Sequence, residues 1–85
     1  MILPVTAGQL PEIKLNTQLI KDLRKLKNFS VSDIAYLLGY KTPTGYWLVE
    51  KGRRQVGADV LYRISQVYER PMEDFLIVED TNKAK

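Results

Sequence analysis

The sequence predicts an all-α domain of five short helices, and three observations lead to this prediction. Apolar residues recur at helical spacing through most of residues 17–75. Residues that start or stop helices bound each of these segments. The chain has 85 residues, which is enough for one domain only. A two-stranded pairing of residues 13–15 with residues 76–78, inside one chain or between two chains, is left open as an addition.

The first helix is expected to begin with Asn16 or Thr17 as its N-cap and to be closed by Asn28. Its apolar residues follow the spacing i, i+1, i+4 and i+7, which predicts one buried stripe. The stripe comprises Leu19, Ile20, Leu23 and Leu26.

The second helix has the densest start signal of the chain. Ser30 is the predicted N-cap, and Asp33 at position N3 completes a shortened capping box. Phe29 and Ile34 are placed as the two ends of a hydrophobic staple. Gly39 is placed to end the helix in a left-handed conformation. The buried face is expected to continue through Ala35, Leu37 and Leu38.

The third helix is expected to begin at Thr42-Pro43, because a threonine N-cap followed by proline at N1 is a strong start signal. It can run to Lys51, with Gly52 as the residue after its end. A fourth helix opens at Gly57, and its apolar residues again have helical spacing. A fifth, very short helix over residues 72–75 follows Pro71.

The composition excludes several kinds of chemistry. The chain has no cysteine and no histidine, so it has no disulfide, no thiol nucleophile, no imidazole base and no metal site built from these residues. The acidic residues are scattered, and no glycine-rich phosphate loop occurs. We therefore expect no enzyme, no catalytic residue and no cofactor. No apolar stretch is long enough to span a membrane and no signal peptide is evident, so we expect a cytoplasmic protein.

The net charge of +3 is distributed unevenly along the chain. Residues 20–63 contain nine Lys or Arg and four Asp or Glu, a net charge of +5. Residues 64–82 contain one Arg and five Asp or Glu, a net charge of −4. This separation favours one side that faces a polyanion, although chance patterning of solvated faces can also produce it.

Two short helices separated by a glycine turn are typical of a helix-turn-helix, whose second helix is presented to a DNA groove. The sequence resembles the Cro-like or XRE type of phage-repressor DNA-binding domain over roughly residues 17–78. The matching residues are Leu23-Arg24, Ser30, Ile34-Ala35, Leu38-Gly39, Glu50, Gly52, Arg54, Leu61, Ile64, Val67-Tyr68, Pro71, Glu73 and Phe75. The chain departs from the family by one additional residue, which should lie in the turn 40–42. The resemblance implies a compact five-helix, lambda-repressor-like domain.

The resemblance implies that helix 43–51 reads the major groove. On a helical wheel Tyr46 and Val49 share one face, and the family places this face in the core. The opposite face would then contact base pairs, although it lacks the Arg, Asn and Gln that make the strongest base contacts. The alternative is a rotated helix whose Trp47 and Leu48 belong to the core. The expected base-contact residues are Lys41, Thr44, Gly45, Trp47 and Leu48.

In the family, phosphate groups are held by the amino end of the second helix, the N-cap of the recognition helix and the basic loop after it. Helix amino ends suit phosphate oxygens because their N–H groups are free and the helix dipole is positive there. The corresponding residues of this chain are Ser30, Val31, Thr42, Lys51, Arg53 and Arg54. The resemblance also implies a structural ion pair between Arg24 and Glu50.

Two functions from different classes follow. The first is a sequence-specific regulator of transcription that binds double-stranded DNA, as a small repressor or Cro-like switch protein of a phage or mobile element. It would act as a homodimer on a palindromic operator, close to the nucleoid. Its expected parts are an N-terminal arm over 1–15, the DNA-binding domain over 16–78 and a tail over 79–85. The alternative is an antitoxin-like or anti-repressor module that docks a protein partner through Trp47 and Leu48.

Overall fold

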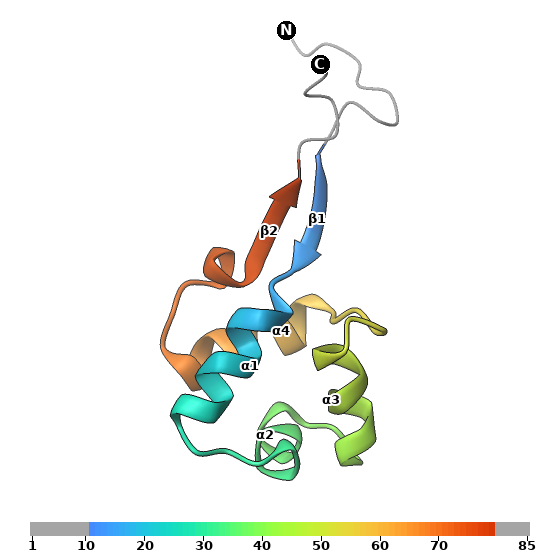
Figure 1. Ribbon diagram of the computed structural model, residues 1–85, viewed down its shortest axis with the longest axis vertical. Coiled ribbons are helices and arrows are strands. Elements are labelled where there is room, and N and C mark those ends of the chain that lie inside the picture. Colours follow the sequence, from blue (N-terminus) through green and yellow to red (C-terminus); the bar gives the residue numbers. More distant parts are fainter. Residues whose placement is uncertain (1–10, 80–85) are drawn as a thin grey trace, which may run out of the picture.

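The computed structural model describes residues 11–79. Figure 1 shows the helices gathered into one globule, from which the two strands extend side by side as a ribbon. Most of the predicted N-terminal arm and tail, residues 1–10 and 80–85, lie outside the described residues. The elements, in chain order, are β1 (Glu12–Leu15), α1 (Thr17–Leu26), α2 (Val31–Leu38), α3 (Pro43–Glu50), α4 (Ala58–Tyr68), the 3-10 turn η1 (Met72–Phe75) and β2 (Leu76–Glu79).

The prediction of an all-α, five-helix, lambda-repressor-like domain is wrong. The described part of the chain forms four α-helices and a two-stranded antiparallel sheet. The expected fifth helix is a single 3-10 turn of four residues, because β2 begins immediately after Phe75. The β-branched residues Ile77 and Val78 favour extended backbone, so the chain pairs with β1 instead of continuing a helix.

The ribbon joins the two ends of the described chain. β1 and β2 pair as antiparallel strands within one chain, which is one of the two arrangements that the sequence leaves open. The backbone N–H of Asn16 donates to the carbonyl oxygen of Phe75 at 2.7 Å and extends the same register towards the globule. The opposed pairs are Glu12 with Glu79, Ile13 with Val78, Lys14 with Ile77 and Leu15 with Leu76.

The core lies where all four α-helices and η1 meet. Its buried apolar residues are Ile20, Ile34, Ala35, Leu38, Tyr46, Val49, Ile64, Tyr68 and Phe75. Two predictions of the buried stripes are wrong, because Leu26 and Leu37 are exposed. Leu26 is the last residue of α1, and its side chain lies outside the core. The buried stripe of α2 is narrower than its apolar content suggests, and Leu37 lies at its margin.

The helices are short. The longest of them, α4, has 11 residues. Within the described range, no helix has the length and apolar character that crossing a membrane requires.

Candidate nucleic-acid interface

The helix α2 begins and ends as its local sequence predicts. Asp33 donates its backbone N–H to the Ser30 hydroxyl at 3.0 Å, and the Asp33 carboxylate accepts the Ser30 N–H at 2.9 Å. This capping box satisfies two N–H groups at the amino end of the helix. The backbone N–H of Ser30 first, and the Ser30 hydroxyl second, lower the pKa of the Asp33 carboxyl below its ordinary value by hydrogen bonding to the carboxylate. Gly39 ends the helix with φ of +89°.

The carboxyl end of α2 is held by a residue from α4. The Arg63 guanidinium donates through Nη1 to the Leu38 carbonyl oxygen at 3.1 Å. A Cβ atom at Gly39 would lie 2.9 Å from the same Nη1. Glycine is therefore favoured at this turn both by its left-handed backbone and by the close approach of Arg63. A positive side chain at a helix carboxyl end is also favourable for the helix dipole.

The helix α3 has the rotation that the helical wheel and the family resemblance together predict. Thr42 is its N-cap and Pro43 occupies its first turn. Tyr46 and Val49 are completely buried, while Trp47 is 43% exposed. The alternative in which the helix is rotated to place Trp47 in the core is therefore wrong. Leu48 is half-buried at the margin between the two faces.

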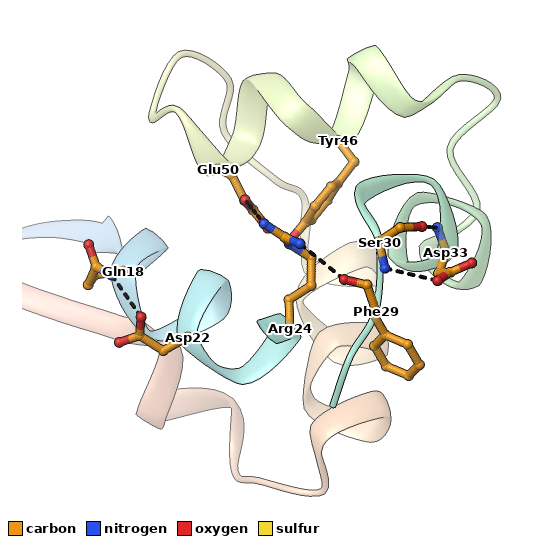
Figure 2. A network of polar contacts seen from close by, with 8 residues as sticks. All are labelled: Gln18, Asp22, Arg24, Phe29, Ser30, Asp33, Tyr46 and Glu50. Atoms are coloured by element: carbon orange, nitrogen blue, oxygen red, sulfur yellow. Dashed lines mark hydrogen bonds and ion pairs between the residues drawn. The ribbon is translucent and has the colours of Figure 1, made fainter. Parts of the chain in front are cut away.

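A hydrogen-bonded network fixes α3 to α1. Figure 2 shows the Arg24 guanidinium from α1 between the Glu50 carboxylate and the Phe29 carbonyl group. Arg24 donates through Nε and Nη2 to Glu50 at 2.6 Å and 3.1 Å, and through Nη1 to the Phe29 oxygen at 3.0 Å. The Tyr46 hydroxyl donates to Glu50 as well. The side chains of Arg24 and Glu50 are only 12% and 6% exposed, so this ion pair is largely shielded from water.

Burial and hydrogen bonding shift the pKa values of the groups in and near this network. The hydrogen bond with Glu50 raises the pKa of Arg24, so the guanidinium stays charged. Burial, followed by the hydrogen bond to Glu50, raises the pKa of Tyr46 and keeps its hydroxyl protonated. Burial also raises the pKa of Tyr68 to about 12. The Tyr68 hydroxyl differs from that of Tyr46, because it is buried without a hydrogen-bond partner among the described residues.

The outer side of α3 and the loop after it are basic and exposed. The Lys51 ammonium lies over the Trp47 ring, 5.0 Å from its centroid. This is within the range of a cation–π contact. Arg53 and Arg54 follow directly and are both exposed. Lys51 and Arg53 place positive charge at the carboxyl end of α3.

Arg54 also reaches back to the amino end of α3. A Cβ atom at Gly45 would lie 3.8 Å from Arg54 Nη1 and 3.1 Å from Cδ1 of Tyr40. The ring of Tyr40 meets that of Tyr46 edge-on, with centroids 6.1 Å apart. Burial raises the pKa of Tyr40, and the positive charge of Arg54 opposes this rise. The Arg54 guanidinium therefore adds its charge to the positive end of the α3 dipole.

All eleven predicted contact residues lie on the α2–turn–α3 unit or on the loop after it. Eight of them are exposed: Ser30, Lys41, Thr42, Thr44, Trp47, Lys51, Arg53 and Arg54. Three are half-buried: Val31, Gly45 and Leu48. Arg24 and Glu50 lie behind α3 and form the expected ion pair.

Sequence reasoning missed three contributors. Tyr40 packs against α3 beside Arg54, the Tyr46 hydroxyl joins the Arg24–Glu50 pair, and Arg63 holds the end of α2. The spacing of Tyr46 and Glu50, one helical turn apart, was the available signal for the second contact. No local signal indicates the contact of Arg63, which is 25 residues from Leu38.

Residues 11–79 contain no group of three Asp or Glu side chains placed to hold a metal ion. Comparison of the sequence with models of known protein families and with curated proteins gives no match.

Proposed function

We propose that this chain is a sequence-specific DNA-binding regulator of the phage-repressor helix-turn-helix type, which reads the major groove of double-stranded DNA with α3. One observation carries the proposal. The inner face of α3 is fixed by buried contacts, while its outer face is exposed and flanked by Lys51, Arg53 and Arg54. A helix of eight residues presented in this way has the dimensions that the major groove accepts.

The phosphate backbone would be held from both ends of α3. At its amino end, the N-cap Thr42 and the guanidinium of Arg54 offer hydrogen-bond donors and positive charge. At its carboxyl end, Lys51 and Arg53 would contact phosphate groups of one of the two DNA strands. The amino end of α2, at Ser30 and Val31, provides a further contact of the same kind.

Base recognition would depend more on shape and apolar contact than on bidentate hydrogen bonds. Thr44, Trp47 and Leu48 can pack against thymine methyl groups, and Gly45 lets the backbone approach closely. Lys41 adds one flexible donor in the turn before α3. A regulator of this kind acts in the cytoplasm, where the DNA is accessible to it, and binds a palindromic operator as a homodimer.

The test is selection of DNA from a random pool, followed by affinity measurements across a salt series. We expect enrichment of a defined sequence, and an affinity that falls steeply as salt rises because several phosphate contacts release counterions. Failure to enrich any sequence, or an affinity that salt leaves unchanged, contradicts the proposal.

The exposure of Trp47 favours a second candidate function. In this candidate the same unit is an antitoxin-like or anti-repressor module that docks a protein through Trp47 and Leu48. Trp47→Ala distinguishes it from the first when compared with Arg53→Ala/Arg54→Ala. If Trp47 is required for activity in the absence of DNA while the arginines are dispensable, the module docks a protein.

A further inference from the structure

The outer edge of β1 has hydrogen-bonding groups that are directed away from β2. Along an antiparallel pair, residues whose backbones are hydrogen-bonded to each other alternate with residues whose backbones are not. Asn16 is bonded to Phe75 in this ladder, so Lys14 and Glu12 are also positions that bond to β2. The N–H and C=O groups of Ile13 and Leu15 therefore point to the edge of β1 that no described strand covers.

The ribbon also carries exposed apolar side chains. Ile13 and Val78 lie directly opposite each other, and they are 53% and 60% exposed. They share one face of the ribbon with Leu15 and Leu76, which are half-buried against the globule. The apolar face of the ribbon thus extends from the half-buried pair Leu15 and Leu76 to the exposed pair Ile13 and Val78.

The opposite face of the ribbon has an unbalanced charge arrangement. Glu12 lies directly opposite Glu79, and like charges in this position are destabilising. Lys14 is placed to offset one of these charges, with its Nζ 3.2 Å from Oε1 of Glu79. A positive group beside Glu12, on the side of β1 that faces away from β2, would balance the Glu12 carboxylate.

We propose that a second copy of this chain pairs with β1 edge to edge, around a two-fold axis at Ile13, to form a continuous four-stranded antiparallel sheet. The segment Glu12-Ile13-Lys14 is complementary to itself in this register. Each Glu12 faces Lys14 of the partner subunit, and the two copies of Ile13 face each other.

The backbone hydrogen-bonding groups and the apolar side chains of the ribbon also fit the register around Ile13. Because the N–H and C=O groups of Ile13 point outward, the two copies exchange both hydrogen bonds at the axis. The outward N–H of Leu15 reaches the carbonyl of Pro11 in the partner subunit, and the ladder ends there because proline has no N–H. On the apolar face, Val78, both copies of Ile13 and the second Val78 form one row.

The outer edge of β2 lacks this complementarity. Its outward-directed residues are Leu76 and Val78. A two-fold pairing around Val78 would place Ile77 opposite Glu79, an apolar side chain against a charge. We therefore assign the interface to β1. This assignment stands on the ribbon alone and does not depend on DNA binding.

The experiment is sedimentation equilibrium of the full chain without DNA, at micromolar concentrations, for the wild type, Glu12→Lys and Lys14→Glu. Each variant alone places like charges across the axis, so we expect the wild type to be a dimer and each variant to be a monomer. An equimolar mixture of the two variants restores opposite charges at both contacts. We therefore expect the mixture to recover the dimer. Circular dichroism verifies that both variants remain folded.

Three results would overturn the assignment. A monomeric wild type shows that the edge does not pair. A dimer that persists in both single variants shows that the interface lies elsewhere. Two monomeric variants that stay monomeric on mixing exclude the register at Ile13.

Discussion

The inner and outer faces of α3 differ in what their polar side chains contact. On the inner face, Glu50 accepts hydrogen bonds from both Arg24 and Tyr46, and little water reaches the group. On the outer face, the Lys51 ammonium lies over the Trp47 ring, and Trp47 is 43% exposed. The inner contacts determine how α3 is oriented, and the outer side chains are left available for another molecule.

This difference separates the two kinds of effect that substitutions should have. Substitution on the inner face should change the stability of the fold, and binding only as a consequence. Substitution on the outer face should change binding and leave the fold unaffected.

Glu50→Ala should have the largest effect on stability. It leaves the Arg24 guanidinium shielded from water without its carboxylate partner, and removal of one member of a buried pair costs about 3–5 kcal/mol. Urea denaturation should show a loss of this size in the free energy of unfolding, and DNA affinity should fall with it. Glu73→Ala removes an exposed carboxylate of η1 and should change the free energy by less than about 0.5 kcal/mol. Lost binding with unchanged stability in Glu50→Ala would contradict the structural role of the pair.

Two tyrosine-to-phenylalanine substitutions should have opposite effects. Tyr46→Phe removes a hydrogen bond to the charged Glu50, and we expect a loss of about 1.5–3 kcal/mol in the free energy of unfolding. Tyr68→Phe removes a buried hydroxyl that has no partner among the described residues, and we expect a gain of about 1 kcal/mol. Denaturation curves of the two variants measure both effects. Equal losses in the two variants would show that their hydroxyl groups are equivalent.

The stability of the fold should fall at alkaline pH. The pKa of Tyr68 is about 12 in the folded chain and 10.0 ordinarily, so the folded chain holds this proton more tightly. The resulting stabilisation is complete below pH 10 and is lost as the pH rises from 10 to 12. Tyr46, whose pKa is also raised, acts in the same direction. Denaturation across this range should show a shallower decline for Tyr68→Phe than for the wild type, and identical declines would contradict this assignment.

Local signals in the sequence predicted the helix boundaries well. The capping box of Ser30 and Asp33, the N-cap Thr42 before Pro43 and the left-handed Gly39 all depend on residues within one turn. Their physical causes are therefore contained in short segments of sequence. The orientation of α3 was predicted from the helical wheel only with the help of a family resemblance.

The remaining features depend on contacts between distant segments. Residues 72–75 have the composition of a helix turn, but pairing with β1 draws the chain into a strand directly after them. Leu26 and Leu37 have the spacing of buried residues, but spacing does not indicate how wide a stripe the neighbouring elements cover. The approach of Arg54 to the amino end of α3 arises only when the loop folds back on the helix.

The most direct test of the difference between the two faces of α3 is a comparison of Arg53→Ala/Arg54→Ala with the wild type on the selected DNA. We expect a free energy of unfolding within about 0.5 kcal/mol of the wild type, because both side chains are exposed. We also expect weaker binding, with a salt slope smaller by about two for the two lost phosphate contacts. The control Lys25→Ala/Arg70→Ala removes the same charge from exposed positions outside α2 and α3, and should retain most of the affinity. If the arginine variant binds as tightly as the wild type with the same salt slope, the outer side of α3 and its loop are not the DNA-binding surface.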